Sequence, residues 1–326
     1  MQESQPMSHP GRMRIVVAFA AVYLIWGSTF LGIFYAIQTI PPFLMAGSRF
    51  ICAGTIMYVI GRLRGDPHPE PNTWGDAFIV GGCLLLFGNG AVTISEKWVP
   101  TGLAALLVAT EPIDVALLSW ATGIAPRPSR WVWLGLILGF CGVGFLVSPL
   151  FAAGGTGSSS HVALGVIILF IGSFVWAAGS LYALKAKHPS SFIMSAGQQM
   201  LCGGLLLLLA GFALGQHHDF DVHRVTWLSL GGWIYLVLVG ALLGYTAYFY
   251  LLRNCAPAKV ATYAYVNPVV AIILGALFAG ERLSLSTIIG AGLIIASVMV
   301  VITAQQFKTA ATISAPAGFA EANDLR

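Results

Sequence analysis

Ten apolar runs, each long enough to cross a membrane, make up most of the sequence. Their ranges are about 14–37, 41–61, 74–94, 100–121, 130–149, 162–183, 191–214, 228–251, 258–279 and 284–304. A membrane-spanning helix needs about 20 apolar residues and satisfies its backbone hydrogen bonds internally. Only 9% of the residues are charged, whereas soluble domains carry about 25%. We therefore expect an all-α integral membrane protein with ten transmembrane helices.

The distribution of lysine and arginine predicts how these helices are oriented. If the N-terminus is cytoplasmic, twelve of the sixteen basic residues fall on the cytoplasmic side, and only Lys97, Arg224 and Arg282 fall outside. This bias is typical of cytoplasmic loops. Both termini are therefore predicted to be cytoplasmic, as tails over residues 1–13 and 305–326. The second tail is expected to be disordered, and residues 150–161 are expected to form a periplasmic linker.

The sequence also contains an internal repeat. The segment Pro42-Phe-Leu-Met-Ala-Gly-Ser-Arg49 resembles Ser191-Phe-Ile-Met-Ser-Ala-Gly-Gln198, and Glu111-Pro112 corresponds to Asn267-Pro268. Because each half, 14–149 and 162–304, has an odd number of spans, the halves are predicted to insert in opposite orientations. Inverted repeats around a central cavity are typical of secondary transporters. The alternative, a repeat that only doubles a structural bundle, stays open.

Two prolines interrupt apolar runs at corresponding places in the two halves. Pro112 and Pro268 each remove a helix hydrogen bond and leave one carbonyl without its usual donor. Such backbone is tolerated in a membrane where it faces other helices, water or a ligand. We interpret the two prolines as matched hinges.

Several motifs together resemble the drug/metabolite transporter superfamily with two EamA-type domains, over about residues 14–304. They are Trp26-Gly-Ser-Thr-Phe30, Pro41-Pro-Phe with Arg49-Phe50, Gly88-Asn-Gly90, Pro100-Thr-Gly-Leu-Ala-Ala105, Ala264-Tyr-Val-Asn-Pro268 and Gly280-Glu-Arg-Leu283. Within the superfamily the chain is similar to ten-span bacterial exporters of amino acids and related metabolites. The resemblance implies an inner-membrane location, a central cavity lined chiefly by spans 1, 3, 4, 6, 8 and 9, and no cofactor.

Other classes of function lack their motifs. No Gly-x-x-x-x-Gly-Lys-Ser/Thr loop is present, which argues against ATP hydrolysis. All seven histidines lie in tails, loops or span edges, and the five cysteines show no paired spacing. We therefore expect no catalytic residue and no metal site within the membrane. The basic residues form no dense run of the kind that binds nucleic acid.

Polar and aromatic residues at helical spacing are the candidates for substrate binding. Aromatic faces attract cations and pack apolar groups without strict geometry, which suits a small amphiphile. Two alternatives stay open: the tryptophans could be packing anchors, and the span-8 tyrosines could lie at the membrane interface. The candidates are Trp26, Asn89, Thr93, Glu111, Trp176, Ser180, Tyr245, Tyr248, Tyr263 and Asn267.

Three charged residues within the spans, Glu111, Asp114 and Arg49, are candidates for proton or charge coupling. An ionised carboxylate at this depth costs several kcal/mol unless it is paired, wetted or protonated. Glu111 could carry a proton or receive the ammonium group of an amino acid. Alternatively, it pairs with Arg49 and locks spans 2 and 4 together. For Arg49 and Glu281 we favour structural pairing.

We expect an exporter of amino acids or related small amphiphilic metabolites that works by alternating access. The alternative is a multidrug or other metabolite exporter of the same fold, for amines or nucleoside-like compounds. An intramembrane transferase is less favoured because no catalytic cluster is present, and a channel because channels more often use oligomeric symmetry. Expected partners are the substrate, membrane lipid and protons, without nucleic acid, in a monomer or loose dimer.

Overall fold

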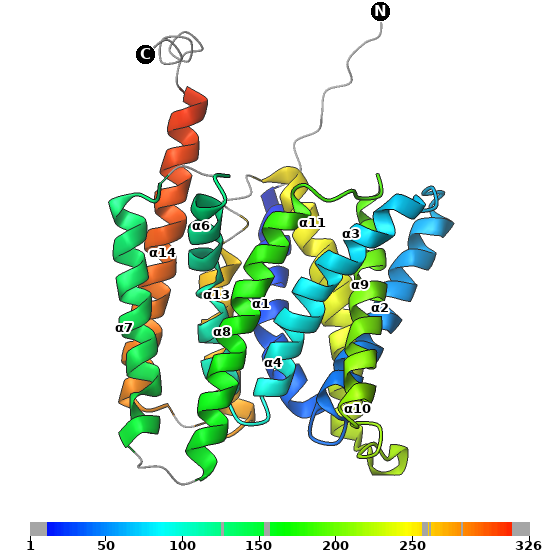
Figure 1. Cartoon of the computed structure of the whole chain (residues 1–326), viewed down its shortest axis with the longest axis horizontal. Helices are drawn as coiled ribbons and strands as arrows, with labels where there is room; N and C mark the ends of the chain where they lie inside the picture. Colours follow the sequence, from blue (N-terminus) through cyan, green and yellow to red (C-terminus); the bar gives the residue numbers. More distant parts are fainter. Residues whose placement is uncertain are drawn as a thin grey trace, which may run out of the picture.

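The computed structural model describes residues 12–124, 127–152, 157–255, 260, 262–281 and 283–314. Within these ranges the regular secondary structure is entirely helical (Figure 1). The elements are α1 Arg12–Ala36, α2 Pro42–Leu63, α3 Pro71–Gly81, η1 Gly82–Asn89, α4 Gly90–Ser95, α5 Thr101–Val108, α6 Glu111–Ala121, α7 Arg130–Ala152, α8 Gly157–Ala183, α9 Phe192–Ala213, η2 Val222–Arg224, α10 Trp227–Tyr235, η3 Leu236–Leu243, α11 Gly244–Asn254, α13 Tyr263–Phe278 and α14 Leu285–Ser314.

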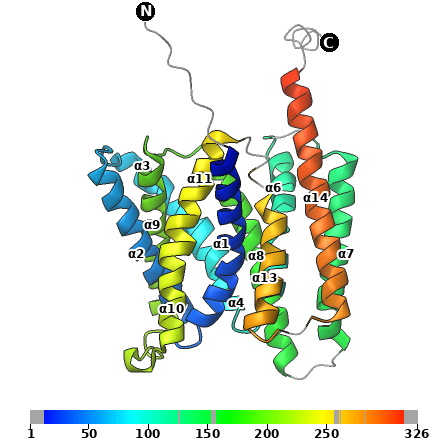
Figure 2. The ribbon, with the colours of Figure 1, turned by 180° about the vertical axis from the view of Figure 1, so that it is seen from behind.

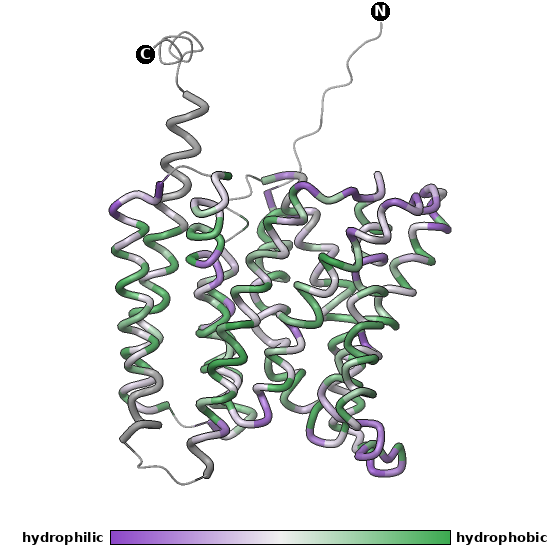
Figure 3. Tube along the Cα trace, viewed as in Figure 1, coloured by the Kyte–Doolittle hydropathy of each residue, from purple (hydrophilic) through white to green (hydrophobic). Residues whose placement is uncertain are grey.

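The helices run alongside one another between two polar faces, with an apolar band between them (Figure 3). In the described part of the chain, seven helical segments are long and apolar enough to cross a membrane. Three shorter apolar helices cover Arg130–Phe145, Val266–Phe278 and Leu285–Val301. Each of these segments overlaps one of the ranges predicted from the sequence. The beginning of α1 and the end of α14 lie at the same face (Figure 1), which we call the terminal face; the other is the opposite face.

Two stretches of π-helix interrupt the helical path at corresponding places in the two halves. The stretch η1 covers Gly82–Asn89 between α3 and α4, and η3 covers Leu236–Leu243 between α10 and α11. They are 154 positions apart in the sequence. A π-helix is rare and is frequently found at functional sites. These stretches could not be predicted from the sequence, because the hydrophobic pattern of a fully apolar run does not distinguish a π-helical turn from an α-helical one.

Helices α2 and α9 pack together through two reciprocal pairs of glycines. A Cβ atom on Gly47 would lie 2.9 Å from the Gly204 carbonyl oxygen, and one on Gly204 would lie 3.0 Å from that of Gly47. Gly54 and Gly197 face each other in the same way, at 2.9 and 3.1 Å. Gly47 and Gly197, like Gly54 and Gly204, are 150 positions apart. Small residues let membrane helices approach closely, and here the approach is reciprocal.

Helices α7 and α14 form a second pair of the same kind. The Ser297 hydroxyl donates to the Gly135 carbonyl oxygen at 2.5 Å, and a Cβ on Gly142 would lie 2.9 Å from the Gly290 carbonyl oxygen. Gly135 and Gly290 are 155 positions apart, as are Gly142 and Ser297. Seen from behind, α1 lies between α13 and the α10–α11 segment (Figure 2), in contact with each of them.

Three boundaries differ from those expected from the sequence. Helix α14 continues to Ser314, whereas a disordered tail is predicted from residue 305. Helices α7 and α8 extend to Ala152 and from Gly157, into the predicted linker over 150–161. The apolar run marks the part of a helix that lies in lipid, whereas the backbone hydrogen bonds of the helix can continue beyond the lipid. The tail residues 1–11 and 315–326 lie outside the described residues.

Candidate functional site

Four of the predicted aromatic residues meet in one group, which we call the aromatic cluster: Trp26, Tyr245, Tyr248 and Tyr263. The Trp26 ring centroid lies 5.7 Å from that of Tyr245 and 5.0 Å from those of Tyr248 and Tyr263. The Tyr248 and Tyr263 rings are 6.0 Å apart and nearly perpendicular. These residues come from α1, α11 and α13, so the cluster joins the two halves of the chain. All four side chains are half-buried.

Glycines position both tryptophans. A Cβ atom on Gly244 would lie 2.5 Å from the Trp26 Nε1 atom, and one on Gly88 would lie 2.3 Å from the Trp176 Cε3 atom. Each indole therefore packs directly on the backbone of a helix from the other half. This contact supports a packing role for each indole, as the alternative reading expects. For Trp26, the ring contacts with three tyrosines come in addition.

Glu111 lies beside the aromatic cluster. It is the first residue of α6, which follows a break in the helix at Ala109 and Thr110. The Trp176 side chain hydrogen-bonds to the Glu111 carboxyl group, and both Tyr248 and Tyr263 are close enough to interact with it electrostatically. One turn further along α6, Asp114 accepts a hydrogen bond from the Ser173 hydroxyl at 3.1 Å. The two predicted carboxylates thus face α8.

Arg49 lies on another side of the cluster. Its side chain is 5% exposed, its Nη2 atom donates to the Asn89 side-chain oxygen, and it interacts electrostatically with Tyr245. Thr93 donates to the Asn89 carbonyl oxygen at 2.8 Å. The described residues contain no ion pair between Arg49 and Glu111. Among these residues no ion pair supports the alternative in which Arg49 and Glu111 lock spans 2 and 4 together, and it stays a prediction.

The family models match the chain over residues 13–148 and 163–303, under the description EamA-like transporter family. The chain belongs to this family. It is 37% identical over 300 residues to the "Uncharacterized inner membrane transporter YedA" of Escherichia coli strain K12, covering 92% of this chain and 94% of that protein. It is 27% identical to the "Uncharacterized transporter YvbV" of Bacillus subtilis strain 168, over 93% and 96% of the two chains.

A third relative and a solved structure extend this likeness. Protein PecM of Dickeya dadantii is 26% identical, over 85% of this chain and 88% of that protein. A crystal structure superposes with a TM-score of 0.60 at 17% identity, covering 91% of this chain and all of that one, which shows the fold alone. The chain is thus a multi-pass membrane transporter of the EamA family, acting on a small molecule in a lipid membrane.

The remaining predicted site residues of this EamA-like transporter have other surroundings. With its amide oriented to satisfy both partners, Asn267 donates to the carbonyl oxygens of Tyr263 and Tyr23 at 3.3 and 3.2 Å, so it ties α13 to α1. Ser180 is half-buried, and none of the contacts in the described part of the chain connects it with the aromatic cluster. The prolines also differ: Pro112 follows a helix break, whereas Pro268 lies inside α13.

Glu281 makes structural contacts, which fit the structural role favoured from the sequence. Its carboxylate accepts hydrogen bonds from the Thr101 backbone nitrogen at 2.5 Å, the Thr101 hydroxyl at 2.7 Å and the Gly102 nitrogen at 3.2 Å. It thereby caps the start of α5, whose first N–H groups have no helical partner. A Cβ atom on Gly275 would lie 2.5 Å from this carboxylate. Glu281 therefore does not pair with Arg49; it joins α5 to the turn after α13.

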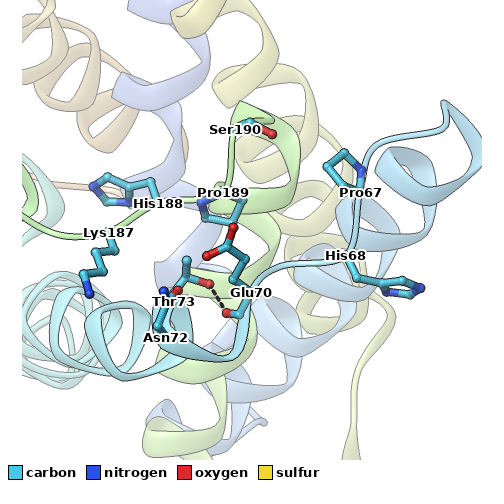
Figure 4. Close-up of a pocket in the computed structure, with 9 residues that line it drawn as sticks. All are labelled: Pro67, His68, Glu70, Asn72, Thr73, Lys187, His188, Pro189 and Ser190. Atoms are coloured by element: carbon cyan, nitrogen blue, oxygen red, sulfur yellow. Dashed lines mark hydrogen bonds between the residues drawn. The ribbon is translucent and has the colours of Figure 1, made fainter.

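A separate pocket of about 430 Å³ opens at the terminal face, between the α2–α3 and α8–α9 loops (Figure 4). Its lining includes His68 and Glu70 from the first loop and Lys187 and His188 from the second. Thr73, at the start of α3, donates to the Glu70 carbonyl oxygen at 2.8 Å. Most of the residues that line the pocket have polar side chains. The pocket lies outside the aromatic cluster and was not predicted from the sequence.

Proposed function

We propose that this EamA-like transporter exports amino acids or related small amphiphilic metabolites across the bacterial inner membrane by alternating access. The observation that carries the proposal is the aromatic cluster with a half-buried carboxyl group, that of Glu111, and a buried guanidinium, that of Arg49, beside it. Glu111 interacts with Tyr248 and Tyr263, and Arg49 interacts with Tyr245. A zwitterion needs an anion for its ammonium group, a cation for its carboxylate and an adaptable surface for its side chain.

The Arg49 guanidinium distinguishes this proposal from the export of amines or cationic drugs. An acid within an aromatic cage suffices to bind a simple cation. A buried guanidinium beside the cage would then repel the ligand and would have to be desolvated without benefit. Arg49 is buried, and within the described part of the chain its one side-chain hydrogen-bond partner is a neutral amide, that of Asn89. It is thus suited to receive a carboxylate, and we place amino acids ahead of amines.

Alternating access would follow from two inverted repeats, over residues 14–149 and 162–304. The reciprocal contacts of α2 with α9, and of α7 with α14, support this symmetry, because each interface repeats the same close approach at two places with the roles of the two helices exchanged. The matched π-stretches η1 and η3 lie in the helices that carry Asn89 and lead to Tyr245. We propose that these stretches, together with Pro112 and Pro268, are where the helices bend as the halves rock.

The test of the proposal is counterflow of labelled amino acids in proteoliposomes, with Trp26→Ala as the first variant. The cluster contributes in proportion to the apolar area it covers, plus about 0.5–1.5 kcal/mol for aromatic pairing. Trp26→Ala should therefore weaken counterflow of leucine or phenylalanine by about tenfold and that of glycine much less. Trp120→Ala is the matched control, because Trp120 contacts Trp133 outside the cluster. An equal loss for all substrates would make Trp26 a packing anchor, and no counterflow by the wild type would refute amino-acid transport.

A second experiment tests the orientation. Reporter tags at Met1 and at Arg326 should both be cytoplasmic, and a tag in the loop from His217 to Arg224 should be periplasmic, since the basic residues favour the cytoplasmic side. Tag accessibility in intact and permeabilised cells measures this. A periplasmic C-terminus would refute the ten-span topology and the inverted repeat with it.

A further inference from the structure

Glu96 is a buried carboxyl group for which the transport proposal has no use. It follows the last residue of α4, at the opposite face, and it is 5% exposed. Among the residues that the structure describes, neither of its side-chain oxygens has a hydrogen-bond partner. An ionised carboxylate without a donor is costly to bury, whereas its protonated form is much less so. The surroundings of Glu96 therefore favour a bound proton.

The charges around Glu96 come from several elements. Arg49 on α2 and Glu281 in the turn after α13 both interact with it electrostatically, with opposite signs. No ion pair between Arg49 and Glu96 occurs in the described part of the chain. On the same face, Lys97 lies over the Trp98 ring, and His161 of α8 stacks on that ring at 5.9 Å. Glu281 accepts hydrogen bonds from three donors, so an ionised Glu96 would place a second carboxylate group near it.

A metal ion fits this site poorly. Hard cations such as Ca²⁺ need about six to eight oxygen ligands, and the Glu281 oxygens are already occupied by Thr101 and Gly102. The described ranges contain no group of three or more histidine, cysteine or acidic side chains that could share a metal ion. The guanidinium of Arg49 disfavours a further cation. The ligand that remains is a proton on Glu96 itself.

Hydrogen bonds between the two halves close the opposite face next to Glu96. Glu281 joins the turn after α13 to the start of α5, and Tyr35 at the end of α1 donates to the Phe278 carbonyl oxygen at 2.6 Å. We propose that Glu96 is a proton-binding site that controls opening of this face: protonated Glu96 permits closure, and loss of its proton favours opening. The proposal rests on the two-sided access described above, but not on the identity of the substrate.

The proton exchanges with the medium on the opposite face. When α5 and the turn after α13 separate, water reaches Glu96, and its carboxyl O–H bond breaks to give a carboxylate and a hydrated proton. The carboxylate is then free to pair with Arg49. Closure reverses the step, because the charge must be neutralised before it is buried again. Acid on this side should therefore favour the closed face and alkali the open one.

Spin labels at Gln38 and Ser284 report on this movement without any substrate. Both residues are exposed, in the turns after α1 and after α13. In nanodiscs, Gln38→Cys with Ser284→Cys in a cysteine-free background should show one short distance at acid pH and a growing longer-distance population as the pH rises. With Glu96→Gln, which mimics the protonated group, the short distance should persist at every pH. With Glu281→Gln, the longer population should be present even at acid pH.

His161→Gln is the matched control, because His161 is another ionisable side chain at the opposite face; the pH response should survive its loss. A wild type whose distances ignore pH would overturn the proposal, as would a Glu96→Gln variant that still responds or a response that disappears with His161→Gln. The pH dependence of the distances in the wild type tests the proposal even if a variant fails to fold. Amino-acid counterflow without a pH response of the distances would refute the Glu96 gate but not amino-acid transport. A pH response without amino-acid counterflow would refute amino-acid transport but not the gate.

Discussion

Glutamine in place of Glu111 should leave the protein folded and inserted but should weaken amino-acid binding by about 100-fold or more. Removing one partner from a buried charge pair costs roughly 3 kcal/mol or more, and each 1.4 kcal/mol is a factor of about ten in affinity. Glutamine keeps the shape of the side chain and can still accept a hydrogen bond from Trp176. What it loses is the charge that the ammonium group of a substrate would meet between Tyr248 and Tyr263. Counterflow of labelled amino acids in proteoliposomes measures the loss.

Two matched variants separate the charge of Glu111 from other effects. Asp114→Asn should have a smaller effect, because Asp114 is already hydrogen-bonded to Ser173 and lies one turn further along α6. Glu70→Gln changes a carboxylate at the terminal face and should transport like the wild type. If Glu111→Gln itself transports like the wild type around neutral pH, Glu111 is neither a proton carrier nor an ammonium ligand. A lower melting temperature with unchanged transport would assign Glu111 a structural role.

Leucine in place of Gly54 should cause the largest loss of stability in this chain. A Cβ atom there would lie 2.9 Å from the Gly197 carbonyl oxygen and 3.0 Å from the Leu201 backbone nitrogen. These are backbone atoms, so α2 and α9 would have to separate. Overpacking costs about 1–3 kcal/mol and more where nothing can move, so we expect a loss of about 3 kcal/mol. Thermal unfolding in detergent, followed by size-exclusion chromatography, measures it.

The α9 side of the same interface offers a second test. A Cβ atom on Gly204 would lie 2.9 Å from the Ile51 backbone nitrogen. Gly204→Leu should therefore destabilise the protein to a similar extent. Gly292→Leu is the matched control, because a Cβ at Gly292 in α14 meets nothing within 4 Å. A Gly54→Leu protein as stable as the Gly292→Leu protein would show that the α2–α9 contact does not hold the halves together.

The helical membrane architecture and the four residues of the aromatic cluster could be predicted from the amino-acid sequence. A single apolar run of about 20 residues that crosses a lipid bilayer forms a helix. Each predicted range therefore overlaps a helix of the structure. Trp26, Tyr245, Tyr248 and Tyr263 could be selected because aromatic and polar residues stand out in an apolar helix. Glu111 stood out for the same reason, since a carboxylate at that depth is costly without a partner.

Which of these residues meet, and which groups the charged residues bind, depends on the tertiary structure and could not be predicted. That Arg49 donates to Asn89, and that Glu281 caps α5, depends on contacts between segments 40 and about 180 positions apart. The π-stretches and the reciprocal glycines escape sequence reasoning because both depend on how closely neighbouring helices approach. Asn267 and Ser180 were selected for their polarity, but polarity alone cannot separate a side chain that faces a cavity from one that bonds to a neighbouring backbone. A sequence pattern identifies the face of a helix, whereas its partner is determined by the packing of the whole bundle.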